Sequence, residues 1–148
     1  MSKSPVIPFE TTLFVKDTCL CLHVQRAARA IARQFDDALR PLDITNGQFS
    51  VLMSLNRPAP PNMRTVALLL AMDRTTLTAA LKPLERRGLV EIFADEEDRR
   101  SRWLRLTPEG ERLLARAVPI WRATHAVVDE RLGEGGPERL RGDLLQFA

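Results

Sequence analysis

Apolar residues recur at helical spacing in the stretch that follows Asp73. The residues on this apolar face are Leu77, Leu81 and Leu84. Asp73 is a favourable N-cap, and Gly88 stands where helices commonly end in the left-handed conformation. Two short strand-forming runs follow, at 89–93 and 103–106, with a charged turn between them. The pattern predicts a helix followed immediately by a β-hairpin.

Helical periodicity also predicts helices on both sides of this pair of elements. These segments cover about 17–40, 46–55, 63–72, 108–132 and 138–147. The expected capping residues are Thr45, Asn62 and Thr107. Each is a side chain that can accept a hydrogen bond from the first turn of a helix. Residues 1–16 contain two prolines and no clear period, so we expect them to form a loosely ordered arm.

The order of helix, helix and hairpin favours a winged helix-turn-helix that binds DNA. Small, hydroxylic and cationic side chains let the second helix lie in a major groove, where its base-facing residues are expected to be Arg74, Thr75, Thr76, Thr78, Ala79 and Lys82. The side chains expected at phosphates or in the minor groove are Arg86, Arg99, Arg100 and Arg102. The alternative for all of them is an ordinary solvated surface.

Three spaced motifs narrow this interpretation. They are Leu84-Glu85-Arg86-Arg87-Gly88-Leu89-Val90, Asp98-Arg99-Arg100 and Leu106-Thr107-Pro108-Glu109-Gly110. In this order they resemble the MarR family of bacterial transcriptional regulators, and the resemblance spans about residues 17–131. It implies a mainly helical fold with a small β-hairpin wing. It also implies that Arg100 enters the minor groove and that Asp98 orients an arginine there.

The resemblance further implies a single domain over residues 1–148 with two parts. The winged helix-turn-helix lobe covers about 45–107, and the dimerisation region covers about 9–40 and 108–148. The residues support the dimerisation region independently of the resemblance, because the apolar faces of the first and last helices are too extensive for a small lobe to cover. We therefore expect a homodimer on double-stranded DNA, with recognition helices roughly 34 Å apart on a pseudo-palindromic operator.

Composition adds few constraints on function. The chain has 148 residues, of which 45% are hydrophobic and 28% charged, as expected for one globular domain. Its net charge of +3 is compatible with nucleic acid without requiring it, so the local basic surface matters more. No apolar run approaches a membrane span and the N-terminus lacks a signal-peptide pattern, which favours a cytoplasmic protein without a membrane partner.

Catalytic motifs are lacking in the sequence. His23 and His125 are far apart and show no zinc-ligand spacing with the cysteines or acids. There is no glycine-rich phosphate loop and no nucleophile elbow. We therefore expect neither an enzyme nor a metal or cofactor site.

The cysteines allow two interpretations. Cys21 resembles the peroxide-sensing cysteine of organic-hydroperoxide repressors, a branch of the same family, and a helix start favours a reactive thiolate. Cys19 is then the nearby partner thiol. Those sensors use tyrosines around the cysteine, whereas this chain has none, and this favours a packing role for Cys21. His23 and Trp121 are candidates for an effector pocket where the dimer and winged regions meet.

The functional hypothesis is a transcriptional repressor that a small-molecule effector releases from its operator. One alternative is a peroxide- or thiol-responsive regulator acting through Cys21. Another is a helical interaction protein that does not bind DNA and that uses Leu68, Leu69 and the chain termini. Leucine is unusual at these two positions in the family, where it either packs against the preceding loop or forms a contact surface.

Overall fold

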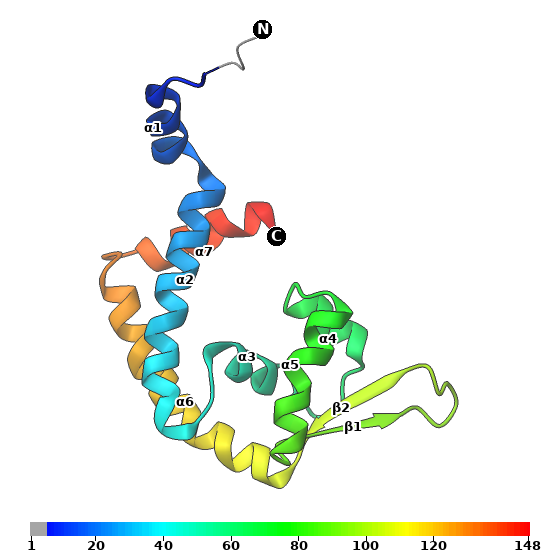
Figure 1. Ribbon diagram of the computed structural model, residues 1–148. Helices are drawn as coiled ribbons and strands as arrows, with labels where there is room; N and C mark the ends of the chain where they lie inside the picture. Colours follow the sequence, from blue (N-terminus) through cyan, green and yellow to red (C-terminus); the bar gives the residue numbers. More distant parts are fainter. Residues whose placement is uncertain (1–5) are drawn as a thin grey trace, which may run out of the picture.

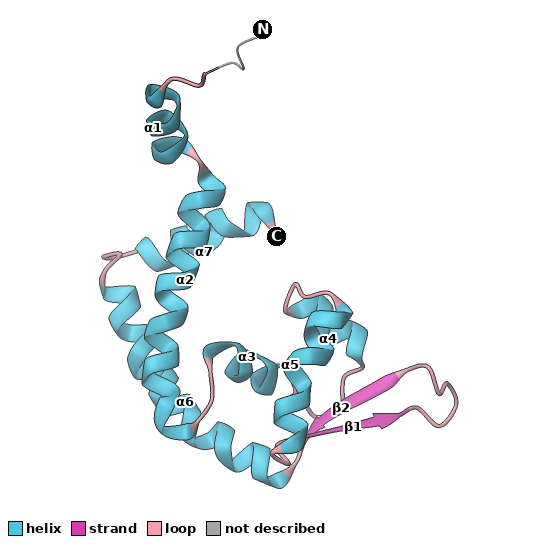
Figure 2. Cartoon of the chain, viewed as in Figure 1, coloured by secondary structure: helices cyan, strands magenta, loops and turns pink. Residues whose placement is uncertain are grey.

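The computed structural model describes residues 6–148 and is mainly helical with one β-hairpin, which confirms the expected fold class (Figure 2). The elements in chain order are α1 (Phe9–Thr18), α2 (Leu20–Leu39), the 3-10 turn η1 (Arg40–Leu42), α3 (Asn46–Ser54), α4 (Met63–Leu69), α5 (Arg74–Arg86), β1 (Val90–Ala94), β2 (Arg102–Leu106), α6 (Pro108–Glu130), α7 (Gly136–Leu144) and η2 (Leu145–Phe147). Figure 1 shows α2, α6 and α7 gathered into one part and α3, α4, α5 and the hairpin into another.

The expected N-caps form as the sequence indicates. Thr45 accepts the N–H of Gln48 at 3.1 Å while the Gln48 side chain accepts the N–H of Thr45 at 3.0 Å, which completes a capping box for α3. Asn62 accepts the N–H of Thr65 at 2.8 Å and so begins α4. Each cap satisfies an amide that the first turn leaves without a helical partner.

Helices α4 and α5 form the helix-turn-helix. Between them the chain turns through Ala71, whose φ is +52° although it is not a glycine. The inward face of α5 consists of the three predicted leucines, all of which are fully buried: Leu77, Leu81 and Leu84. They pack in a continuous core with side chains of α3 and β2, including Leu52 and Leu104. This packing holds the opposite face of α5 towards solvent.

The hairpin is attached to the start of α4 as well as to the end of α5. Its antiparallel register pairs Val90 with Leu106 and Ala94 with Arg102. The outer edge of β2 continues into a short bridge, in which Trp103 pairs with Asn62 and the N–H of Leu104 donates to the carbonyl of Pro61 at 2.9 Å. Because Asn62 also caps α4, one residue sets both the start of that helix and the position of the wing.

Arg87 ties the end of α5 to the end of the first long helix. Its guanidinium donates to the backbone carbonyl of Asp43 and, at 3.3 Å, to that of Leu42. These carbonyls lie at the turn that follows α2 and η1. The C-terminal end of α5 is therefore hydrogen-bonded, through the side chain of Arg87, to the turn that follows α2. The part formed by α2, α6 and α7 is called the helical scaffold below.

The expectation for the N-terminal arm is wrong for residues 9–16, because they belong to α1. Every residue of α1 is at least partly exposed and its apolar side chains lie on several sides, so no helical period is visible in the sequence. Cys19 interrupts the helix that was expected to start at Asp17: it is extended, its N–H donates to Val15, and its Sγ accepts the N–H of Leu22 at 3.4 Å. Residues 1–5 lie outside the described part of the chain.

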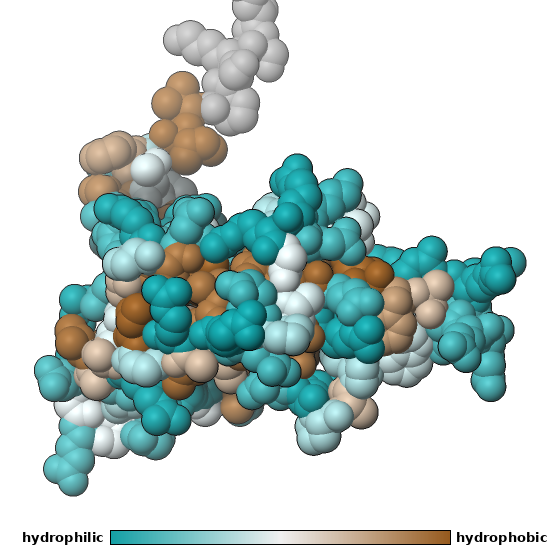
Figure 3. Space-filling model, turned by 90° about the horizontal axis from the view of Figure 1, so that it is seen from below, coloured by the Kyte–Doolittle hydropathy of each residue, from teal (hydrophilic) through white to brown (hydrophobic). Residues whose placement is uncertain are grey.

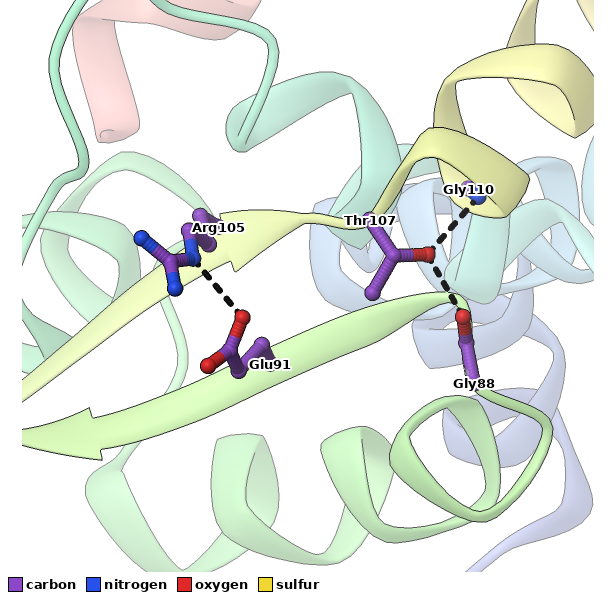
Figure 4. A network of polar contacts seen from close by, with 5 residues as sticks. All are labelled: Gly88, Glu91, Arg105, Thr107 and Gly110. Atoms are coloured by element: carbon purple, nitrogen blue, oxygen red, sulfur yellow. Dashed lines mark hydrogen bonds and ion pairs between the residues drawn. The ribbon is translucent and has the colours of Figure 1, made fainter.

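The join between the wing and α6 depends on Thr107 and Gly110. The Thr107 hydroxyl donates to the carbonyl of Gly88 and accepts the N–H of Gly110 at 3.1 Å, so it links the end of α5 to the start of α6 (Figure 4). Gly110 lies against the backbone of Leu89, and a Cβ placed there would be 2.0 Å from the Leu89 carbonyl oxygen. Only glycine permits this approach.

Gly110→Ala should therefore destabilise the fold by about 2–3 kcal/mol, because a methyl group cannot occupy the space held by backbone atoms. Gly142→Ala is the matched control: it also lies in a helix, but nothing lies within 4 Å of its added Cβ. The control should gain up to about 1 kcal/mol from helix propensity. Urea unfolding followed by circular dichroism measures both, and equal stabilities would contradict the close contact at Gly110.

Candidate nucleic-acid interface

One exposed surface of α5 collects most of the residues predicted to face bases. A shallow depression on this surface is lined by Arg74, Thr75, Thr78, Ala79 and Lys82. Thr78 is half-buried and donates its hydroxyl to the Arg74 carbonyl at 2.7 Å, which leaves its oxygen and methyl group for other contacts. The surface is therefore rich in small groups flanked by two cations, as a helix in a major groove requires.

The first turn of α5 is held by Asp73. Its carboxylate accepts the backbone N–H of Thr76 at 2.7 Å and the hydroxyl of the same residue at 3.0 Å. These hydrogen bonds lower the pKa of Asp73. The Thr76 hydroxyl thus donates within the protein, so Thr76 is left with an acceptor and a methyl group for DNA.

The fold brings the wing next to the start of α5. A groove of about 570 Å³ separates the wing from α4 and α5, and its walls include Arg74, Arg100 and Arg102. We call it the arginine groove. Sequence spacing alone did not indicate this convergence, because residues 74 and 100 are joined only through the tertiary fold. Arg86 and Arg99 do not line the groove: Arg86 is in the last turn of α5 and Arg99 is at the wing tip, and both are exposed.

Asp98 acts on the wing backbone. Its two carboxylate oxygens accept the N–H of Arg100 at 3.0 Å and the hydroxyl of Ser101 at 3.1 Å. Within residues 6–148, Asp98 forms no ion pair with an arginine. The turn thus places Arg100 through its main chain and leaves the guanidinium free to contact a ligand, and the role of Asp98 at DNA stays a prediction.

Two further contacts stiffen the wing tip. The indole N–H of Trp103 donates to Asp95 at 2.8 Å, and the other Asp95 oxygen accepts the N–H of Glu97 at 2.8 Å. These bonds lower the pKa of Asp95, with the Glu97 amide contributing most. The Arg102 guanidinium donates to the backbone carbonyls of Arg99 and Ser101, so Arg102 supports the tip from inside.

At the base of the wing, a cross-strand pair holds the two strands together. Arg105 donates to Glu91 at 2.8 Å (Figure 4). The Arg105 guanidinium also lies over the ring of Phe93, 4.8 Å from its centroid. The hydrogen bond with Arg105 lowers the pKa of Glu91 and raises that of Arg105. Arg105 is thus engaged within the hairpin, unlike Arg100.

The redox and effector candidates fall into two separate places. Cys21 is exposed in the first turn of α2, where its sulfur accepts a hydrogen bond from the Gln25 amide at 3.1 Å. A packing role for Cys21 within one chain is therefore wrong. His23 is exposed nearby and its Nδ1 lies 2.7 Å from the Cys19 carbonyl oxygen.

Trp121 lies in a different environment, between the helical scaffold and the winged lobe. It stacks on Phe49 with ring centroids 6.0 Å apart and borders a cavity of about 510 Å³. His23 does not line this cavity, so the expected pairing of His23 with Trp121 does not occur. The other lining residues, which sequence reasoning did not assign to a pocket, are Phe49, Ser50, Met53, Ser54, Leu69, Leu70, Val118 and Arg122. The sequence predicted Phe49 only as part of the helix at about 46–55, and nothing in the sequence indicated its position beside Trp121.

The paired leucines of α4 are both exposed, Leu68 by 73% and Leu69 by 60%. The expectation that they pack against the preceding loop is therefore wrong. Leu68 borders the arginine groove and Leu69 borders the cavity next to Trp121. Neighbouring residues of one helix thus face two different hollows.

The fold and the basic face define a winged helix-turn-helix DNA-binding protein. Residues 44–101 match the MarR family. The organic hydroperoxide resistance transcriptional regulator of Bacillus subtilis (strain 168) is 33% identical over 101 residues, which are 68% of this chain and 69% of that protein. The chain belongs to the MarR family and is a DNA-binding transcriptional regulator, not an enzyme.

Solved structures agree with this assignment. Transcriptional regulator MosR of M. tuberculosis in complex with DNA has a TM-score of 0.79 and 37% identity, and the match covers 86% of this chain and 92% of that one. The transcriptional repressor CouR bound to a 23-mer DNA duplex has a TM-score of 0.71 and 30% identity, over 97% and 95% of the two chains. Among the described residues, no helix is both long and apolar enough to cross a membrane.

The depressed pKa of Asp95 predicts an acid transition of the wing. Its stabilising hydrogen bonds are fully present above the ordinary aspartate pKa and should be lost as the pH falls through the lowered value, below about pH 4. Trp103 emission in a Trp121→Phe background should report this change. Asp95→Asn should remove the transition, and a transition that persists in this variant, or that coincides with loss of helical circular dichroism, would contradict the assignment to the wing.

Proposed function

We propose that this chain is a cytoplasmic, homodimeric repressor that binds a pseudo-palindromic operator. The observation that carries the proposal is the convergence of the exposed face of α5 and the arginines of the wing on one side of the lobe. The residues proposed to contact bases are Arg74, Thr75, Thr76, Thr78, Ala79 and Lys82. Those proposed to contact phosphates or enter the minor groove are Arg86, Arg99, Arg100 and Arg102. The similarity to CouR, a transcriptional repressor solved on a DNA duplex, supports repression as the sign of regulation.

The dimer is supported by apolar surface that one chain leaves uncovered. On α1, Phe9 and Phe14 are 68% and 66% exposed, and at the C-terminus Phe147 is 76% exposed. Figure 3 shows apolar side chains that stand clear of the body of the protein, and Figure 1 shows α1 and α7 near the same end of α2. A second copy is the partner that such a surface requires at two-fold symmetry.

Release from the operator is assigned to a small-molecule effector in the cavity beside Trp121. The cavity is bordered by side chains of α3, α4 and α6, so it lies between the scaffold and the helix-turn-helix. Its walls are mostly apolar and it has the size of an ordinary ligand site. Arg122, which is exposed, is among the lining residues, and its charge favours an effector with an apolar body and an acidic group.

A thiol response is the second candidate. Cys21 is exposed, and Cys19 lies at the break between α1 and α2, where a change at sulfur would alter the angle between two helices of the proposed dimer. The B. subtilis relative is named for organic hydroperoxide resistance. The absence of tyrosine from this chain argues against the same sensing arrangement and keeps this route in second place.

The DNA proposal predicts a steep salt dependence, because cationic side chains displace counterions from DNA. Arg100→Ala should weaken binding to all duplexes, whereas Arg74→Ala should mainly reduce discrimination between operator and random DNA, by roughly 1–3 kcal/mol if it reads a guanine. Fluorescence anisotropy at several salt concentrations measures both effects, with an operator selected from genomic fragments. Arg116→Ala, an exposed change on α6 outside the groove, is the control.

Affinity that does not change between about 50 and 200 mM salt would overturn the DNA proposal. Sedimentation of the free protein, whose chain mass is 16.7 kDa, tests the dimer in the same samples. A monomer at the concentrations that bind operator would refute the two-fold arrangement while leaving the interface on each lobe in place.

The two proposed release signals act at different residues: the effector acts beside Trp121 and the oxidant acts at Cys21. If an acidic effector acts at Trp121, operator release should accompany quenching of Trp121 emission, and wild type and Cys21→Ser should respond alike. Organic hydroperoxide should then leave operator affinity unchanged in both. Loss of affinity in the oxidised wild type but not in Cys21→Ser, together with a sulfenic acid or mixed disulfide at Cys21, would establish the thiol route instead.

A further inference from the structure

The arginine groove contains one cation that does not belong to the set expected from the sequence. Arg64, in the first turn of α4, lines the wall of the groove opposite the wing. With Arg74 from α5 and Arg100 and Arg102 from the wing, guanidinium-bearing residues from three elements surround a space of about 570 Å³. Their convergence is a property of the tertiary fold, since α4 and the wing are far apart in sequence.

These charges are not neutralised within the described protein. Among residues 6–148, the guanidinium groups of Arg64, Arg74 and Arg100 form neither an ion pair nor a hydrogen bond, since Arg74 and Arg100 bond to Thr78 and Asp98 only through their main chains. In the same part of the chain, no aspartate or glutamate lines the groove. By contrast, the nearby acids Asp95 and Asp98 are turned to the backbone of the wing and to Trp103. A site with this charge takes an anion.

Part of the groove wall is apolar. Leu68 borders the groove together with Met63, Ala67 and Met72, and its side chain is largely exposed. The exposed Leu68 leaves apolar surface in contact with water when the groove is empty. It fits a ligand in which charged groups alternate with hydrocarbon, such as a phosphodiester chain with its sugar carbons.

We propose that this groove holds the sugar–phosphate backbone of one DNA strand, with Arg64 as a phosphate contact and Leu68 against the deoxyribose. The inference rests on the proposed DNA interface and extends it to α4. It follows from the shape of B-DNA, in which the backbone is the ridge that separates the major groove from the minor groove. A protein that places α5 in one groove and the wing in the next must straddle that ridge.

A test follows from counterion release. Each lost phosphate contact should reduce the slope of log K against log salt by about 0.9 per protomer, hence by roughly 1.8 for a dimer. Arg64→Ala should show this decrease and should weaken operator and random duplexes equally. Arg64→Lys should retain most of the slope because it keeps the charge. Leu68→Ala should weaken binding about threefold with no change of slope, since no charge is removed.

The controls separate this inference from the DNA proposal itself. Arg116→Ala, on α6, should leave affinity and slope unchanged, and thermal unfolding checks that each variant is folded. If Arg74→Ala and Arg100→Ala weaken binding but Arg64→Ala leaves the slope intact, the groove assignment fails while the interface on α5 and the wing stands. If calorimetry without DNA shows pyrophosphate binding that depends on Arg64, and Arg64→Ala leaves the DNA slope intact, the groove is a small-anion site and the strand assignment is overturned.

Discussion

The close contact between Gly110 and the backbone of Leu89 is the constraint on which the DNA-binding lobe depends. At this point the end of α5, the first strand of the wing and the start of α6 occupy the same small space, and the Thr107 hydroxyl joins the first to the last. Leu89 and the three buried leucines of α5 belong to the same hydrophobic core. Because the contact admits no side chain, the start of α6 can lie directly against the segment that joins α5 to β1.

A second joint sets the other side of the lobe. Asn62 caps α4 with its side chain and pairs with Trp103 through its main chain, so the wing and the first helix of the helix-turn-helix share an anchor. The wing tip is then held by Asp95, Asp98 and Arg102 through bonds that stay inside the hairpin. Arg64, Arg74 and Arg100, which face the groove between the wing and the helices, take no part in these bonds.

Local patterns predicted much of this architecture. Caps at Thr45, Asn62, Asp73 and Thr107 act within one helical turn, and the apolar face of α5 is a property of neighbouring residues, so both are visible in the sequence. Helix α1 was missed because its apolar residues have no single face. The positions of Arg64 beside the wing and of Phe49 beside Trp121 depend on how distant elements pack, which no local period encodes. The orientation of Asp98 was also unreadable, because a carboxylate two residues from an arginine can bond either its guanidinium or its amide.

The bond from Arg87 to the carbonyls of Leu42 and Asp43 has a consequence for how such a regulator diversifies. It fixes the C-terminal end of α5 to the turn that follows α2, while most of the residues proposed to contact bases lie in the N-terminal half of α5. In the proposed dimer, a tilt of α2 would swing the whole recognition helix as a rigid lever without altering its reading surface. The tilt of α2 would then set the distance between the two recognition helices, and the surface of α5 would set the base preference. Related regulators could therefore respond to different effectors that tilt α2 and still bind the same operator sequence.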